Sequence, residues 1–194
     1  MMSQKQPKEI RVESIITAAI EEFLEKGYDG ASVNAIAAKA GVSKGGLYHH
    51  FPNKEVLLME ANKKLSEPIV KIAEEAYYNV SAIHGLSNYV RGYLEYWVTR
   101  PKELSFFFFS MSRSFESKLL MDYYKEYMQA SIEFFTGMFQ RAAALGEINI
   151  TDPQSYGITL MGALDGVLTY AMLHPKMEIN TLVNQIKKIW IDRE

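Results

Sequence analysis

Two short helices joined by a tight turn are predicted within residues 32–55, and this stretch constrains the chain most. Ser32 and Ser43 are good N-terminal caps, and Gly41 between them suits a sharp turn. The second helix ends before Pro52, because the residue that precedes a proline avoids the helical region. One side of this helix is too polar to be buried, and the helix is too short to be stable alone. A helix-turn-helix that reads DNA has these properties.

The distribution of charge supports contact with nucleic acid. The whole chain has a formal net charge of −2, which gives no indication of an acidic partner. Residues 31–54, however, contain three lysines and two histidines and no acid. Affinity for DNA depends first on neutralising phosphates, so a local basic patch is what a DNA-binding surface requires. An ordinary solvated face would have the same composition.

Helical periodicity extends over almost all of the 194 residues, and strand-like alternation is scarce. The pattern predicts an all-α fold of about nine helices. A three-helix helix-turn-helix domain (residues 1–54) would be joined rigidly, through the fourth helix, to a C-terminal helical bundle (residues 55–194). The expected helices span residues 8–26, 33–40, 44–50, 54–77, 82–98, 101–113, 117–145, 153–174 and 179–191, with a kink or break at Pro68.

The second short helix would turn Lys44, Gly45, Tyr48 and His49 outward. Lysine can donate to a guanine edge or a phosphate, and tyrosine and histidine can contact phosphates or bases. Gly45 and Gly46 each cost about 1 kcal/mol relative to alanine inside a helix. Their presence is explained if the backbone approaches a partner closely. A weak, loop-like segment is the alternative.

Residues at many positions between Ile10 and Leu58 match the pattern of a known protein family. They are Ile15 to Phe23 with Ala18-Ala19, Gly27-Tyr28, Ser32-Val33, Ile36-Ala37, the run from Ala40 to Gly45, Leu47-Tyr48, His50-Phe51 and Lys54-Glu55. This stretch resembles the N-terminal domain of the TetR/AcrR family of bacterial transcriptional regulators. The resemblance covers about a quarter of the chain, and the remainder matches only in helix number, order and length.

The resemblance implies a homodimeric, cytoplasmic repressor that binds a double-stranded DNA operator and has a divergent ligand-binding domain. By position it implies DNA contacts from Ser32, Val33, Ser43, Lys44, Gly45, Tyr48, His49 and Lys54. Gly46 occupies a position of the recognition helix but has no side chain with which to read a base.

Eight of the ten phenylalanines follow residue 105, and four of them are consecutive, at residues 106–109. Four consecutive positions cover most of a helix circumference. Either that helix is buried nearly all round, or one or two rings point into a cavity. Aromatic residues and methionines suit a pocket for a small hydrophobic or aromatic effector, although ordinary core is the alternative. The expected ligand-binding residues are Tyr93, Trp97, Phe107, Met111, Tyr124, Tyr127, Met128, Phe135, Met161 and Asp165.

Asp165 stands alone in an apolar run, and a buried unpaired carboxylate is costly. It is expected to anchor a ligand or, alternatively, to form a helix cap or a hydrogen bond within a dimer. Glutamates on helix surfaces also allow a cationic effector. Small residues on helix 153–174 and apolar residues on helix 179–191 predict a four-helix dimer seam. These residues are Gly157, Gly162, Ala163, Gly166, Leu182, Ile186, Ile189 and Trp190.

Several classes of protein are not expected. Cysteine is absent, which fits a reducing compartment, and neither a signal peptide nor a membrane-spanning apolar run is evident. No metal or other cofactor is expected, because His84 and His174 lack metal-ligand spacing. An enzyme is not expected, since no nucleophile elbow or phosphate loop is present. We expect a ligand-responsive transcriptional repressor; the alternative is a DNA-binding factor without a small-molecule switch, either architectural or regulated by a protein.

Overall fold

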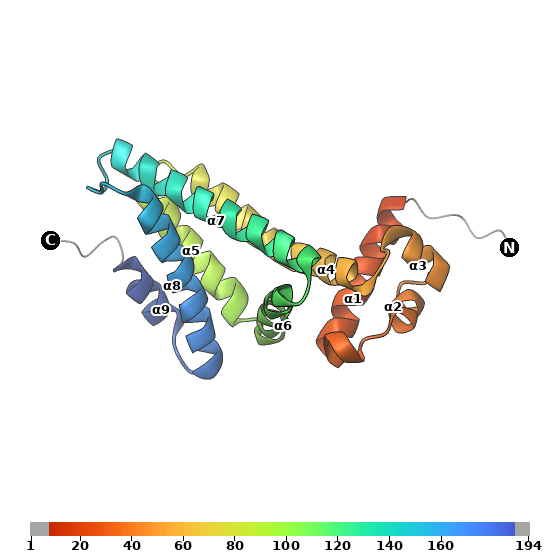
Figure 1. The fold of residues 1–194 in the computed structure, drawn as a ribbon. Coiled ribbons are helices and arrows are strands. Elements are labelled where there is room, and N and C mark those ends of the chain that lie inside the picture. Colours follow the sequence, from red (N-terminus) through yellow and green to blue (C-terminus); the bar gives the residue numbers. More distant parts are fainter. Residues whose placement is uncertain (1–7, 189–194) are drawn as a thin grey trace. The chain divides into compact units, whose positions relative to one another are not determined.

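The computed structural model describes residues 8–188, which are helical with no β-strand (Figure 1). This confirms the prediction of an all-α fold. The elements are α1 (Lys8–Gly30), α2 (Val33–Lys39), α3 (Lys44–His50), α4 (Lys54–Tyr77), α5 (Ala82–Val98), α6 (Pro101–Ser112), the 3₁₀ turn η1 (Arg113–Phe115), α7 (Lys118–Ala144), α8 (Pro153–Leu173) and α9 (Ile179–Lys187).

The helix boundaries agree with the sequence patterns except at two places. Gly27 interrupts α1 with a φ of +69°, as expected of a helix stop, but one more turn follows to Gly30. Pro68 lies inside α4, which continues to Tyr77 rather than breaking. The last residues assigned to the expected final helix, including Ile189 and Trp190, lie outside the described residues.

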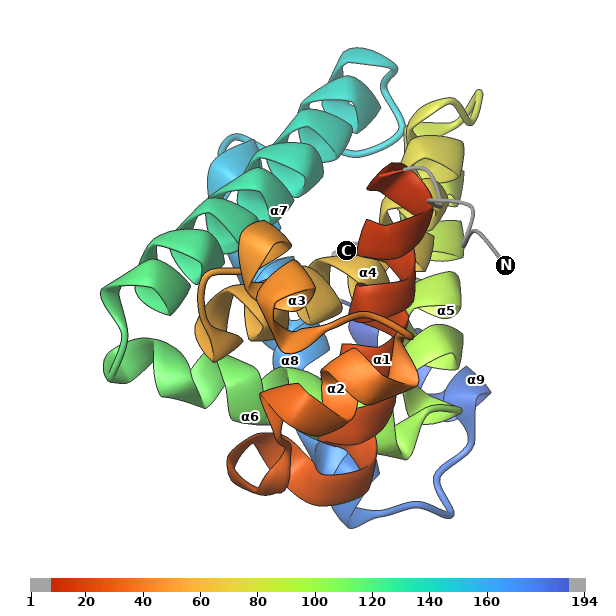
Figure 2. The same ribbon diagram turned by 90° about the vertical axis from the view of Figure 1, so that its right-hand side faces the viewer.

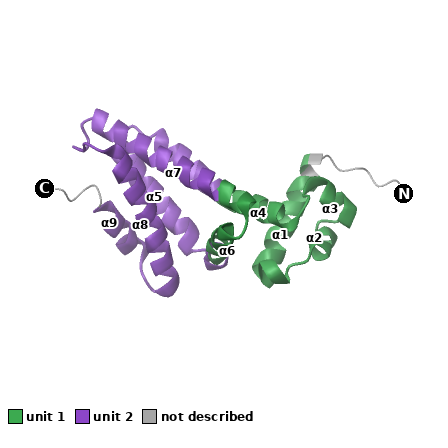
Figure 3. Ribbon diagram, viewed as in Figure 1, with its two compact units in different colours: residues 1–66, 105–123 green, residues 67–104, 124–194 purple. Residues whose placement is uncertain are grey.

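The chain forms two compact units (Figure 3). The first contains the chain up to Ser66 together with Ser105–Tyr123, and the second contains Glu67–Leu104 and the chain from Tyr124 onward. Helices α4, α6 and α7 therefore each contribute residues to both units. The functional division between residues 54 and 55 stays a prediction.

The first unit is built on α1, with α2 and α3 lying beside it in both views (Figures 1 and 2). Its core contains Ile15 and Phe23 from α1, Ile36 from α2 and Leu47 from α3, each at most 1% exposed. Burying an apolar side chain of this size contributes about 1.5–3 kcal/mol. This core fixes the position of α3, whose other side faces solvent.

The part of α6 assigned to the first unit packs against α1. The Phe106 ring stacks on Phe23 with 5.6 Å between centroids, and Phe107 is buried. Phe109 is 39% exposed. The expectation that this helix is buried nearly all round is therefore wrong, because successive side chains turn by 100° and the last ring reaches the opposite side of the helix.

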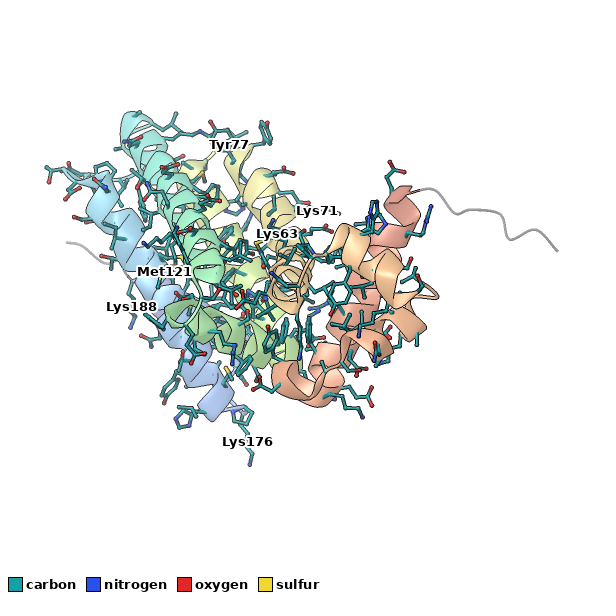
Figure 4. The ribbon with its side chains drawn as sticks, turned by 45° about the vertical axis from the view of Figure 1, so that its right-hand side comes forward. Lys63, Lys71, Tyr77, Met121, Lys176 and Lys188 are labelled. Carbon is teal, nitrogen blue, oxygen red and sulfur yellow. The ribbon has the colours of Figure 1, made fainter. Side chains whose placement is uncertain are left out.

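In the second unit, both α8 and α9 pack against α5 (Figure 1). Leu182 and Ile186 of α9 are 3% and 2% exposed within the single chain. Their expected place in a dimer seam is therefore wrong, because α5 already covers the apolar face of α9. The Arg141 side chain of α7 donates hydrogen bonds to the carbonyls of Tyr77 (Figure 4) and Asn79, which ties the α4–α5 loop to α7.

Helix α8 leaves a row of apolar and small residues uncovered. Ile158 is 50% exposed and Leu173 is 73% exposed, and a Cβ added at Gly162 or Gly166 would meet nothing within 4 Å. By length and composition, α8 is the one helix within residues 8–188 that is apolar enough to cross a membrane. This is weak evidence, since a helix from the interior of a protein passes the same test.

Candidate nucleic-acid interface

Local hydrogen bonds define the two short helices and the turn between them. Ser32 Oγ accepts from the backbone N–H of Ala35 at 3.0 Å, and Ser43 Oγ accepts from that of Gly46 at 3.0 Å. Between them, Gly41 has a φ of +67°, which side-chain-bearing residues rarely adopt. The sequence thus sets this geometry through two caps and one glycine.

The polar side of α3 is exposed. Leu47 is buried on the opposite side of the helix, whereas Lys44, Tyr48 and His49 face solvent. Lys44 forms no ion pair within the described part of the chain. A helix with exposed donors at its N-terminal end, seated on a packed core, matches the geometry needed to enter a major groove.

Lys39 does not contribute a free charge to the expected basic patch. Its Nζ lies 3.1 Å from Glu22 and 3.2 Å from Glu25, both on α1. The hydrogen bonds to these carboxylates raise the pKa of Lys39. The lysine therefore joins α2 to α1, and the basic character of the interface comes from Lys44 and the groups around it.

The two glycines of α3 have different surroundings. A Cβ on Gly46 would lie 3.2 Å from Ser43 Oγ, the atom that caps the helix. A Cβ on Gly45 would meet nothing within 4 Å, and Gly45 is exposed. The fold therefore explains a glycine at position 46, whereas no neighbour among the described residues requires one at position 45.

The remaining expected DNA contacts lie around α3. Ser32 is exposed and Val33 half-buried at the start of α2, and Lys54 is half-buried at the start of α4. The Nζ of Lys54 lies 4.5 Å from the centroid of the Tyr28 ring. Burial lowers the pKa of Lys54, and the nearby Arg113 guanidinium adds to this effect. The aromatic ring holds the ammonium group in place by a cation–π interaction.

Arg113 of η1 meets the same ring, although it lies far along the chain. Its guanidinium carbon is 4.9 Å from the Tyr28 centroid, and its nitrogens lie 3.8 Å from Asp29 and 3.4 Å from Glu116. Arg113 thereby attaches η1 to the end of α1, within the first unit.

Comparison with known proteins identifies the helices just described. A family model for bacterial regulatory proteins of the tetR family matches residues 15–61. The fatty acid metabolism regulator protein of Bacillus subtilis is 39% identical over 74 residues, which cover 38% of this chain and 37% of that protein. The transcriptional regulator RutR of Escherichia coli K12 is 23% identical over 188 residues, 92% of this chain and 88% of that one.

Residues 15–61 of this chain are therefore similar to bacterial regulatory proteins of the tetR family. The crystal structure of the transcriptional regulator FadR from Bacillus subtilis, in complex with stearoyl-CoA, has the same fold. Its TM-score is 0.74 at 21% identity, with coverage of 94% of this chain and 100% of that chain. The chain spans just over a third of the length of the Bacillus fatty acid regulator that it matches in sequence.

The residues expected to bind a ligand fall into both units. Phe107, which is buried, and Met111, which is half-buried, belong to the first unit. The other eight belong to the second unit. Of these, Tyr93, Trp97, Tyr124, Phe135 and Met161 are buried, whereas Tyr127, Met128 and Asp165 are half-buried. No group of three metal-ligating side chains occurs among residues 8–188.

Four of those eight residues lie in one cluster. Tyr93 shares a hydrogen bond with Tyr127, and the Asp165 carboxylate raises the pKa of Tyr93 after the larger effect of burial. Phe135 joins them through Tyr89, which stacks on Tyr93 at 5.7 Å and meets Phe135 edge-on at 5.2 Å.

Three important residues were missed by the sequence patterns. Tyr89 lies four residues before Tyr93, so the helical spacing of tyrosines on α5 was a usable signal. Tyr28 and Arg113 are 85 positions apart along the chain, and no local pattern predicts their contact. Only the tertiary fold brings them together.

Two polar atoms on the first-unit part of α4 are buried without a partner among the described residues. Asn62 Oδ1 and Ser66 Oγ have no hydrogen bond, while the Asn62 amide donates to the carbonyl of Leu58 at 2.8 Å. The two residues are 0% and 7% exposed and one helical turn apart. Buried polar atoms of this kind normally find a water or a ligand.

Proposed function

We propose that this tetR-family chain is a ligand-responsive transcriptional repressor of the cytoplasm. A dimer binds a palindromic DNA operator, and a small hydrophobic or aromatic effector releases it. One observation carries the proposal: the unit that exposes the basic side of α3 also contains Ser105–Tyr123, a segment from the other half of the chain. Phe106 and Arg113 of this segment contact Phe23 and Tyr28 of α1, so a change in the segment would reach the unit that exposes α3.

DNA binding is assigned to the exposed side of α3 and its surroundings. The proposed contacts are Ser32, Val33, Ser43, Lys44, Gly45, Tyr48, His49 and Lys54. Lys44 and the helix backbone at Gly45 enter the major groove, while the caps and Lys54 bind phosphates. Few side chains remain to read bases, so contacts to phosphates supply much of the affinity.

Dimerisation is assigned to the exposed side of α8, which carries Ile158, Gly162, Gly166 and Leu173. A twofold dimer buries the same patch on both subunits. It also presents two recognition helices to successive major grooves, about 34–36 Å apart, and so requires a palindromic operator. The outer side of α9 exposes the polar residues Asn180, Asn184 and Gln185.

The response to an effector is assigned to α6 and η1. Phe106 and Arg113 connect this segment to Phe23 and Tyr28 on α1. An effector acts only if it binds the DNA-free state more tightly than the DNA-bound state. Movement of η1 would change the surroundings of Lys54. It would also change the spacing of the two recognition helices in the dimer.

The relatives and the buried aromatic side chains support a hydrophobic effector. One relative is named for fatty acid metabolism, and one similar structure contains stearoyl-CoA. In this chain, the candidate residues that are buried are mainly aromatic, as in pockets for apolar ligands.

Changing Lys44 to alanine tests the assignment to DNA. Operators are first selected from a random pool of duplexes, and affinity is then measured by fluorescence anisotropy between 50 and 200 mM salt. We expect the affinity of the wild-type protein to fall steeply with salt, and K44A to bind roughly tenfold or more weakly with a shallower salt slope. The control is Lys71→Ala, an exposed lysine on α4 (Figure 4). Equal affinities of K44A and wild type would refute the assignment.

Changing Tyr28 to leucine tests the position of Lys54. We expect operator affinity to fall about three- to tenfold, because the ring no longer holds the ammonium group. In a double-mutant cycle with Lys54→Ala, the loss of binding free energy in the double variant should be smaller than the sum of the two single losses by on the order of 1 kcal/mol. Lys63, which is labelled in Figure 4, and Tyr123 form the control pair, with 5.7 Å from Nζ to the ring centroid. If the two losses are simply additive, the Tyr28 ring does not act on DNA binding through Lys54.

A screen of small molecules against the operator complex tests the response itself. A compound that releases the operator supports the repressor. If none of a broad set of apolar, aromatic and charged compounds changes operator affinity, the chain is a DNA-binding factor without a small-molecule switch.

A further inference from the structure

Arg113 of η1 contacts one aromatic ring and two acids. Its guanidinium carbon lies 4.9 Å from the centroid of the Tyr28 ring, and one of its nitrogens lies 3.8 Å from a carboxylate oxygen of Asp29. A second nitrogen lies 3.4 Å from the carboxylate of Glu116, three residues further along the chain. A planar guanidinium can stack on a ring while its edge binds carboxylates. Arg113 therefore neutralises two acids beside the ring that holds Lys54.

The Lys54 ammonium contacts the same ring but has no acid of its own. Its Nζ lies 4.5 Å from the Tyr28 centroid. Lys54 forms no ion pair in the part of the chain that the structure describes. Its charge is therefore available to a DNA phosphate, which is the role that the proposed function assigns to it.

Asp29 is the acid best placed to compete for this ammonium. It follows Tyr28 directly in the chain, and its side chain is 81% exposed. Burial has the largest effect on the pKa of Lys54 and lowers it; Asp29 then raises this pKa, and Arg113 lowers it. Glu55 follows Lys54 on α4, but adjacent residues of a helix do not face each other. Two cations thus share Asp29, and Arg113 forms the ion pair with it.

The Tyr28 ring is held in place by α1 itself. It stacks on Phe23 at 5.7 Å with 30° between the planes, and Phe23 stacks in turn on Phe106 at 5.6 Å. Phe23 is 1% exposed, so this contact lies in the core of the unit. Loss of the Arg113 charge would therefore change the electrostatic surroundings of Lys54 while the ring stays where it is.

We propose that Arg113 is a positioning residue for DNA binding: it holds Asp29 and so leaves the Lys54 ammonium free for a phosphate. Without Arg113 the Asp29 carboxylate pairs with Lys54 instead, and the phosphate has to displace it. The proposal rests on the proposed function, which assigns Lys54 to a phosphate. It deepens that function by naming the carboxylate through which η1 acts on the DNA-binding surface.

The expected size of the effect follows from the exposure of these groups. An exposed ion pair changes an affinity by up to about fivefold, because water and salt screen it. The proposed dimer carries two such sites, and their effects multiply. We therefore expect Arg113→Gln to weaken operator binding by roughly tenfold at 50 mM salt, and by less as the salt concentration rises.

Suppression by a second substitution tests this exchange. Operator affinity is measured by fluorescence anisotropy for wild type, R113Q, Asp29→Asn and the double variant. We expect D29N to change the affinity of the wild-type protein by less than about twofold, since Arg113 already holds this carboxylate. In R113Q the same substitution should restore most of the lost affinity, because no acid is then left to pair with Lys54. Equal effects of D29N in the two backgrounds would refute the exchange.

Glu116→Gln is the matched control, since Glu116 is the other acid paired with Arg113 and is 71% exposed. It removes the same charge, and we expect it to leave R113Q weak. Arg113→Lys keeps the positive charge and should stay within about twofold of wild type. Melting temperatures show whether each variant folds. A folded R113Q that binds the operator as tightly as wild type would overturn the proposal.

The pKa of Lys54 provides a measurement that needs no DNA. It is followed by the NMR shift of the Lys54 Cε atom between pH 8 and 12, assigned by comparison with Lys54→Arg. Loss of Arg113 should raise this pKa, because a like charge is removed and Asp29 becomes a partner. D29N should then lower the pKa more in R113Q than in the wild-type protein.

Failure of this exchange is distinguishable from failure of DNA binding. If K44A and K54A both bind every selected duplex as tightly as wild type, the DNA-binding surface is wrong, and the Lys54 pKa still tests the exchange. If both variants bind weakly but D29N does not restore R113Q, the proposed function stands and the exchange is refuted.

Discussion

Replacing Gly45 with alanine is expected to stabilise the protein and to weaken operator binding by up to about a hundredfold. An added Cβ meets nothing within 4 Å, and alanine is more favourable than glycine in a helix by up to about 1 kcal/mol. The same methyl group would lie between α3 and the DNA. Steric overlap in a well-packed contact costs typically 1–3 kcal/mol, which corresponds to the expected loss of affinity.

Gly46→Ala is the matched control, because it adds the same atom one position further along α3. Its Cβ would lie 3.2 Å from Ser43 Oγ and disturb the cap. Loss of such a cap costs about 0.5–2 kcal/mol, so G46A should lower the melting temperature. The two variants should therefore shift stability in opposite directions.

Melting is followed by circular dichroism and operator affinity by fluorescence anisotropy. If G45A binds the operator as tightly as wild type, the backbone of α3 does not approach DNA closely. The glycine pair would then mark a weak, loop-like segment, and only side chains of α3 would read bases.

The sequence predicted correctly those features that depend on interactions between residues close together in the chain. Ser32, Ser43 and Gly41 predicted both short helices and the turn, and each acts through an interaction within a few residues. The helix ends were also predictable, since caps and glycines operate over one turn. Pro68 is the exception, because tertiary packing can maintain a helix through a proline that the isolated sequence would break there.

The parts that could not be predicted depend on contacts between distant segments. Lys39 belongs to the basic patch predicted from the sequence, but in the structure this lysine of α2 forms ion pairs with Glu22 and Glu25 of α1. Nothing in the sequence around Arg113 indicates that it meets Tyr28. Charge patterns along a chain do not indicate which opposite charges meet in three dimensions.

The apolar faces of the last two helices illustrate the same limit. Both α8 and α9 carry apolar residues, and the sequence assigned both sets to a dimer seam. The structure separates them, because α5 buries Leu182, Val183 and Ile186 of α9, whereas part of α8 stays uncovered. Periodicity identifies an apolar face but not which neighbour covers it.

The uncovered side of α8 leads to a second large effect. Gly162→Arg is expected to leave each subunit folded, because no atom lies within 4 Å of the added Cβ and arginine is a good helix former. In a twofold dimer the two arginines would face one another across a close contact. We expect a monomer at micromolar concentration, measured by light scattering.

Loss of the dimer should weaken operator binding by two to four orders of magnitude, because the second recognition helix no longer binds at a high effective concentration. The control Ala130→Arg adds the same charge to an exposed position on α7 and should remain dimeric. A dimeric G162R would contradict the assignment to α8. If Asn184→Arg, on the polar side of α9, then gave a monomer, the seam would lie on that helix, and the apolar row from Ile158 to Leu173 would need another partner.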